Sequence, residues 1–117
     1  GLRGFPGIAG YSASKFAVVG FAQALRDELS DTGVEVRVLC PPPVDTPMVR
    51  SLPEVPPVFT MAPAIKPQKV ARALLQAVDG NGPHVILVDA RSKVLWSVAR
   101  LLPGTVDELV RRAMRSG

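Results

Sequence analysis

Apolar side chains recur with a helical period near the start of the chain, from about Ser12 to Ser30. One stripe with spacings of three and four residues is formed by Val18, Phe21, Ala22, Leu25 and Leu29. Phe16 and Val19 add a second apolar face, so the pattern predicts a helix buried between a sheet and another packed layer. The preceding glycine-rich residues 1–10 predict a loop, and Gly33 is the predicted stop of the helical region.

The next segment, Val34 to Cys40, alternates between β-branched and other residues, which predicts a strand. Three prolines, Pro41 to Pro43, end this strand. A proline-rich stretch follows from Val44 to Ala64, where we expect a loop with a short helix near Thr46 to Leu52. Loops of this length are uncommon in compact domains and often act as binding lids.

The last part of the chain returns to regular elements. A second helix is predicted over KVARALLQAVDG, opened by Lys66, and a second strand over His84 to Asp89. Two short helices follow, from Lys93 to Leu102 and from Val106 to Arg115. A Pro-Gly pair separates them, and Thr105 is the expected N-cap of the second.

Helices and strands that alternate in this order predict an α/β fold with a parallel sheet. We divide it into an active-site loop and helix (1–33), a strand with a substrate lid (34–64), and the last helix, strand and C-terminal helices (65–117). Two strands cannot cover the apolar faces of these helices well. The domain is therefore expected to be incomplete on its own, and the isolated chain to oligomerise, aggregate or pack loosely.

Composition narrows the class of protein. Of 117 residues, 47% are hydrophobic and 21% charged, which is typical of a globular chain. No apolar run reaches membrane-spanning length, and the N-terminus does not resemble a signal peptide. It also lacks Met, so we expect a piece of something longer. Cys40 is the only cysteine, which excludes an internal disulfide and favours a small buried residue in a reducing, cytoplasmic setting.

Metal and nucleic-acid functions are not favoured. His84 is the only histidine, which argues against a zinc site and a Ser-His-Asp triad, and we expect a solvated edge residue there. The net charge of +4 comes partly from Arg111, Arg112 and Arg115. With one Tyr and one Trp available for stacking, these arginines predict a solvated helix end rather than a nucleic-acid platform.

The apolar segment from Val94 to Leu102, followed by arginines, leaves a membrane-surface role open. A helix that packs on the domain or lines the substrate pocket is the favoured interpretation.

Tyr11 and Lys15 are the candidates for chemistry. Residues four apart on a helix lie on the same face, one turn from each other. A free tyrosine has a pKa near ~10, and a nearby ammonium favours the phenolate. Such a tyrosine exchanges protons with a substrate hydroxyl or carbonyl. The spacing alone is weak support, because Tyr and Lys four residues apart are common on helix surfaces.

The surroundings of the pair carry more information than the pair itself. The loop GLRGFPG leads into YSASK, then into the helix FAVVGFAQALRDEL and the strand VEVRVLC. The turn after the strand contains Pro41, Val44, Asp45, Thr46 and Pro47, and the helix KPQKVARALLQAV and the strand HVILVD follow. In order and spacing, over almost the whole chain, these segments resemble the C-terminal half of the short-chain dehydrogenase/reductase family.

The resemblance implies a Rossmann-like, doubly wound parallel sheet, of which this chain would be the C-terminal portion. It also implies an oxidoreductase that moves a hydride between NAD or NADP and a carbonyl or alcohol. By similarity, Tyr11 would be the catalytic acid/base. Lys15 would stabilise its phenolate and hold the nicotinamide ribose hydroxyls, so both residues would also contact the cofactor.

Further roles follow from the same resemblance. The turn from Pro41 would pass beside the nicotinamide, Val44 would offer its backbone to the carboxamide, and Thr46 its hydroxyl to the cofactor. The loop from Pro47 to Ala64 would be the substrate lid. The first helix would pack on a partner subunit, which makes the full-length form a homo-oligomer.

Two departures from the family pattern change the expectation. Pro42 stands where the family has Gly, and proline fixes φ near ~−65°, which puts cofactor contact at this turn in question. The family's glycine-rich phosphate loop, its residue that chooses between NAD and NADP, its Asn and its catalytic Ser would all lie upstream of Gly1. The 117-residue chain alone is therefore expected to be inactive.

Two functions stay open from the sequence. The favoured one is an NAD(P)-dependent oxidoreductase to which this chain contributes its C-terminal half. The alternative is a non-catalytic remnant that pairs with an intact relative through its first helix. For the enzyme, the apolar lid residues Val55, Val58, Phe59 and Met61 favour a small hydrophobic alcohol or ketone, such as a lipid, a steroid or an aromatic compound.

Overall fold

The computed structural model describes residues 1–56, 59–60, 62–80 and 82–115. The elements run along the chain as α1 (Ala9–Glu28), β1 (Val38–Cys40), α2 (Pro47–Arg50), α3 (Pro67–Asp79), β2 (Val85–Leu87), α4 (Ala90–Leu101) and α5 (Pro103–Arg115). Within these described residues, no helix is long and apolar enough to cross a bilayer. The predicted lid residues Val58 and Met61 lie outside the described part.

The two strands pair in parallel, with Val38 opposite Val85 and Cys40 opposite Leu87. Val38 and Leu87 are buried. An isolated parallel bridge between Val44 and Ile65 continues the same alignment beyond the carboxyl end of β1. The predicted α/β class with a parallel sheet is confirmed.

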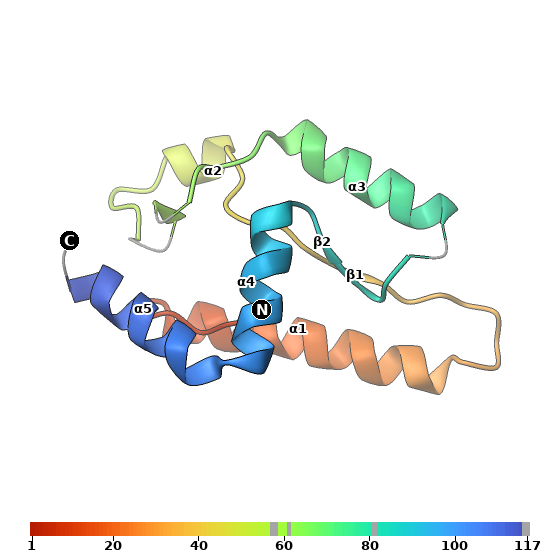
Figure 1. The fold of residues 1–117 in the computed structure, drawn as a ribbon. Coiled ribbons are helices and arrows are strands. Elements are labelled where there is room, and N and C mark those ends of the chain that lie inside the picture. The colour runs from red at the N-terminus through yellow and green to blue at the C-terminus, as the bar shows by residue number, and fades with distance from the viewer. Residues whose placement is uncertain (57–58, 61, 81, 116–117) are drawn as a thin grey trace.

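The helices form layers around this short sheet. In Figure 1, α1 runs along one side of the strands and α3 along the other, while α4 crosses the view between them. The Arg37 guanidinium donates a hydrogen bond to the Ala77 carbonyl, which ties α3 to the chain just before β1. The strands are thus flanked by helices on both sides, as a parallel sheet requires.

Both strands are shorter than predicted. The expected strand from Val34 to Cys40 pairs only from Val38 onward. The Val36 carbonyl, which would continue the ladder, instead meets the His84 side chain, whose Nδ1 lies 2.7 Å away. The expected strand over His84 to Asp89 is limited to Val85–Leu87. Asp89 leaves the strand and accepts a hydrogen bond of 3.1 Å from the Ser92 amide as the N-cap of α4.

Helix boundaries also differ from the prediction. α1 begins at Ala9 rather than Ser12 and ends at Glu28, and Gly33 lies beyond it with a positive φ of 77°. The expected N-cap role of Thr105 was wrong, because α5 already begins at Pro103. Proline is well suited to a first helical position, since its φ is pre-set and the missing amide hydrogen has no helical partner there. The short helix expected near Thr46 is confirmed as α2.

The core is small, and α1 contributes little to it. Buried apolar residues are Ala22, Val38, Leu87, Val106 and Val110. Phe16, Val18 and Phe21 of α1 are 47%, 52% and 68% exposed. The prediction that both apolar faces of this helix are buried is therefore wrong for the described chain, because its strands offer too little surface to cover them.

Candidate active site

The head of α1 is positioned by the loop that precedes it. Gly7 takes a positive φ of 80°, which turns the chain into the helix. The Ser12 amide then donates to the Ile8 carbonyl at 2.8 Å. The Ser12 hydroxyl is buried and accepts a hydrogen bond of 3.4 Å from the Phe5 amide. Because Ser12 anchors the loop from within, the neighbouring Tyr11 is left facing outward, with 51% of its surface exposed.

Tyr11 and Lys15 meet as the spacing predicted. The Lys15 Nζ lies 5.2 Å from the centre of the Tyr11 ring. The Ser14 hydroxyl donates a hydrogen bond of 2.7 Å to the Tyr11 carbonyl, so it is engaged with the backbone. Both side chains are exposed, so the ammonium and the phenol ring lie together on one open face of α1.

The described part of the lid reaches this pair. The Phe59 ring stands edge-on to Tyr11, with the ring centres 6.2 Å apart and an angle of 70° between the planes. The Phe59 amide donates a hydrogen bond of 2.9 Å to the Pro56 carbonyl. Phe59 thus places an apolar ring beside the ring of Tyr11.

The turn after β1 presents free backbone groups. Ile65 donates to the Pro43 carbonyl and accepts from the Asp45 amide, both at 2.9 Å. In a parallel bridge, the residue between these two partners turns its own amide and carbonyl to the opposite side. The backbone of Val44 therefore points away from Ile65 and remains available to a ligand. Pro41, where the turn starts, is exposed.

Pro42 is accommodated in this turn without strain. Across the described residues, positive φ occurs only at glycines, Gly7 and Gly33. No left-handed conformation is therefore needed at position 42, where the family pattern has Gly.

Thr46 has a structural task besides any ligand contact. Its hydroxyl oxygen accepts a hydrogen bond of 3.4 Å from the Val49 amide, which makes Thr46 the N-cap of α2. The hydroxyl hydrogen remains able to donate, because the cap uses only the oxygen as an acceptor. Asp45 beside it forms an ion pair of 2.7 Å with Arg50. The first turn of α2 therefore fixes the position of Thr46.

Gly1 connects the two halves of the site. A side chain at Gly1 would collide with the Lys15 carbonyl, so this residue packs directly on the backbone of α1. The backbone nitrogen of Gly1 lies within electrostatic range of both Lys15 and Cys40. The carboxyl end of β1 therefore lies near the turn of α1 that carries Lys15. Cys40 is only half-buried, yet burial raises the pKa of its thiol, which keeps it neutral near pH 7.

The C-terminal helix is tied to the same region, which the sequence did not indicate. Arg3 in the loop before α1 forms an ion pair of 2.9 Å with Asp107 of α5. The Arg3 guanidinium also lies 5.9 Å from the centre of the Phe5 ring. Like the Ile65 bridge, this contact joins residues far apart in the sequence, so no local pattern could have revealed it.

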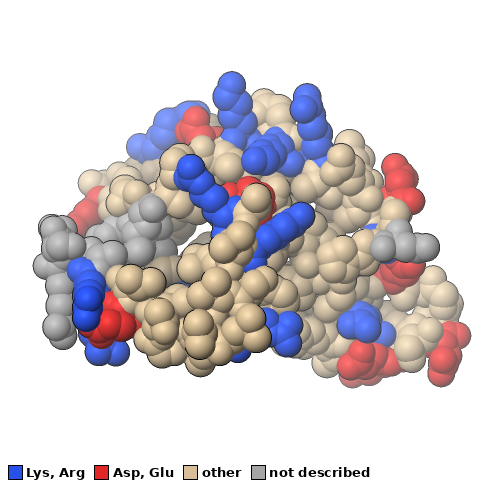
Figure 2. All heavy atoms as spheres, viewed as in Figure 1, with Lys and Arg blue, Asp and Glu red and all other residues tan. Residues whose placement is uncertain are grey.

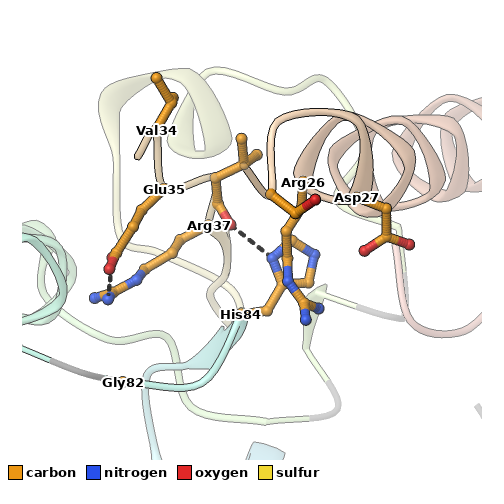
Figure 3. Close-up of a pocket in the computed structure, with 9 residues that line it drawn as sticks. Arg26, Asp27, Val34, Glu35, Arg37, Gly82 and His84 are labelled. Atoms are coloured by element: carbon orange, nitrogen blue, oxygen red, sulfur yellow. Dashed lines mark hydrogen bonds and ion pairs between the residues drawn. The ribbon is translucent and has the colours of Figure 1, made fainter. Parts of the chain in front are cut away.

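A separate cavity lies near the carboxyl end of α1, and neither Tyr11 nor Lys15 lines it (Figure 3). Arg26, Asp27 and Glu35 line it, together with His84. The expectation of a solvated His84 was wrong: Nδ1 lies 2.7 Å from the Val36 carbonyl, and Nε2 is buried. Among the described residues, no three acidic, cysteine or histidine side chains come together as a metal site would require.

Comparisons with known proteins indicate the family of this chain. The family model for short chain dehydrogenase matches residues 1–56. The 3-ketodihydrosphingosine reductase of Dictyostelium discoideum is 35% identical over 109 residues, which cover 89% of this chain and 31% of that protein. Estradiol 17-beta-dehydrogenase 11 of Rattus norvegicus is 30% identical over 110 residues, which cover 92% of this chain and 35% of that protein.

A solved structure shows the same fold. A short chain dehydrogenase from Burkholderia cenocepacia, in complex with NADP, superposes with a TM-score of 0.70 and 28% identity. The match covers 96% of this chain and 44% of that one. The chain spans about a third of the length of the two relatives above. The family-model match, these relatives and the shared fold together show that the chain belongs to the short-chain dehydrogenase family.

Proposed function

We propose that this chain carries the proton-transfer half of an NAD(P)-dependent oxidoreductase that interconverts a carbonyl and an alcohol. The observation that carries the proposal is the Lys15 ammonium held 5.2 Å from the centre of the Tyr11 ring, on a half-exposed face of α1. The NADP bound to the Burkholderia cenocepacia relative supports the choice of cofactor class.

In this proposal Tyr11 is the acid/base. In the reductive direction, the phenol donates its proton to the carbonyl oxygen of the substrate, and Lys15 stabilises the phenolate that results. In the oxidative direction, the phenolate takes the alcohol proton. A bound nicotinamide would supply or accept the hydride at the carbon of the same group. Phe59 shields the phenol from water on one side.

The turn after β1 fits the nicotinamide end of such a cofactor. The backbone amide and carbonyl of Val44 face away from Ile65, and a carboxamide can pair with one donor and one acceptor. Thr46 offers a hydroxyl hydrogen from a fixed helix cap. Pro41 would pass beside the nicotinamide ring, and Lys15 would donate to the ribose hydroxyls. Residues 1–117 contain no glycine-rich loop that would bind the phosphates of the cofactor.

The substrate is proposed to be a hydrophobic alcohol or ketone. The edge-on contact of Phe59 with Tyr11 supports this proposal, because it puts an apolar ring beside the proposed acid/base. The relatives are named for a ketosphingosine derivative and for a steroid, both largely apolar compounds. The single, unbridged Cys40 fits a reducing cytoplasmic environment.

Residues 1–117 by themselves are proposed to be inactive. A dinucleotide is usually bound through its phosphates at a helix N-terminus after a glycine-rich turn, and this sequence offers no such turn. In the active form, α1 would pack against a partner subunit, which would cover Val18 and Phe21.

A test of this proposal uses the protein at its native length, purified from the cell that makes it. We expect reduction of hydrophobic ketones with NADPH or NADH. Replacing Lys15 by Met should lower kcat/KM at least about a hundredfold, because the phenolate loses its ammonium and the ribose a donor. Lys69→Met, which removes an exposed ammonium from α3, should leave the rate unchanged.

The second candidate function is a non-catalytic remnant that pairs with an intact relative through α1. The exposure of Val18 and Phe21 favours it, because these side chains lie on one face of α1 that a second helix would cover. Absence of turnover, together with recovery of the chain in a complex with a complete family member, would support the remnant and contradict the enzyme.

A further inference from the structure

One face of α4 is left open. The exposed apolar residues along it are Val94 (63%), Leu95 (49%), Val98 (37%), Leu101 (79%) and, just past its end, Leu102 (58%). Their spacings of three and four place them on one side of the helix, and we call this set the α4 stripe. The favoured expectation for this segment, a helix packed on the domain or lining a pocket, does not account for these side chains.

The packing of α4 uses a different face. Trp96 lines a groove together with Phe16 of α1 and Val85 of β2. The Arg100 guanidinium covers the Trp96 ring, at 4.8 Å from the ring centre. Helix α4 therefore packs on the domain through Trp96. The α4 stripe is a second apolar surface, which this packing does not use.

The charges on α4 itself have one sign, although Asp89 caps its first turn. α4 contains Arg91, Lys93 and Arg100 and no acidic residue. The acidic residues of α5, Asp107 and Glu108, are both engaged in ion pairs with arginines. Figure 2 shows uncharged surface over the lower part of α4 and the start of α5, with several basic side chains and a smaller acidic area above it.

We propose that the α4 stripe docks on an anionic lipid surface. The apolar side chains would enter the boundary between headgroups and acyl chains, while Arg91 and Lys93 pair with lipid phosphates. At 12 residues α4 would lie in the plane of the interface. A second copy of the chain fits less well, because two α4 helices face to face would bring like charges together. The inference does not depend on the proposed hydride chemistry.

Vesicle sedimentation of the native-length protein tests this docking. The wild-type protein should sediment with vesicles of phosphatidylcholine and phosphatidylserine and much less with phosphatidylcholine alone. Val94→Glu with Leu101→Glu should abolish sedimentation. The matched control is Leu75→Glu with Val78→Glu on α3, whose side chains are 64% and 74% exposed, and it should bind like the wild type.

A second pair of substitutions tests the charges. Arg91→Gln with Lys93→Gln should weaken binding to the anionic vesicles by roughly fivefold per charge removed and reduce its sensitivity to salt. All the altered residues are exposed, so thermal unfolding and any turnover should match the wild type.

Three outcomes would overturn the inference. One is a wild-type protein that ignores anionic vesicles. Another is equal loss of binding from the α3 and α4 double variants. The third is a change in the size of the soluble protein, without any vesicle binding, when the α4 stripe is altered, since that would assign the stripe to protein contacts.

Discussion

The first turns of α1, its head, and the rest of the helix, its body, are built differently. At its head, Ser12 is buried against the Phe5 amide, and Tyr11 meets both Lys15 and Phe59. Along its body, Phe21 is 68% exposed and Ala22 is the buried apolar residue. The head is thus fixed by contacts within this chain, whereas the body has little cover among the described residues. Geometry suited to chemistry can therefore be set locally, while burial depends on surfaces from farther away.

The largest expected effect concerns two glycines that lie in these two regions. Gly1→Ala should destabilise the protein by about 2 kcal/mol, because the new Cβ would collide with the Lys15 carbonyl and come within 2.9 Å of Val19 Cγ2. Gly20→Ala, in the open body of α1, should instead stabilise it by roughly 0.5–1 kcal/mol, since no atom would lie within 4 Å of the Cβ.

Thermal and urea unfolding of both variants, at native protein length, measures this contrast. If Gly20→Ala destabilises the protein as much as Gly1→Ala does, another segment or subunit approaches the body of α1 closely. The body of α1 would then be enclosed in the native-length protein, and the contrast with its head would hold only for the residues described.

A smaller effect is expected from two serines in the head. Ser12→Ala should lower the free energy of unfolding by about 1 kcal/mol, because it leaves the Phe5 amide without its acceptor. Ser14→Ala should change it by less than about 0.5 kcal/mol, since its hydroxyl is exposed and bonds only the Tyr11 carbonyl. Equal losses in a chemical denaturation experiment would show that burial of Ser12 does not anchor the loop.

Local patterns predicted much of what matters for the site. The helical period placed Tyr11 and Lys15 on one face, and the structure brings them together. A short helix was expected near Thr46 to Leu52, where α2 lies. Both features depend on residues within a few positions of one another, which is why the sequence alone reveals them. The parallel strand pair joins distant segments, and it was predicted from the order of helices and strands rather than from a local pattern.

Features that depend on distant partners could not be predicted in this way. Strand β1 is short because the side chain of His84, just before β2, meets the Val36 carbonyl. Helix α4 starts earlier than predicted because Asp89 caps it. The bridge of Val44 to Ile65 joins the two ends of the lid. The exposure of α1 agrees with the expectation that two strands cannot cover its apolar faces, which came from the number of strands and not from the helical period.

The most direct test of the account replaces Tyr11 by Phe in the native-length protein and measures kcat with a hydrophobic ketone and NADPH or NADH. The substitution keeps the ring beside Phe59 and removes only the phenolic hydroxyl. We predict a fall in kcat of roughly 10²–10⁴-fold with an unchanged thermal midpoint, as expected for a lost acid/base. A variant that retains more than about a third of the wild-type kcat would contradict the assignment of Tyr11 as the proton donor.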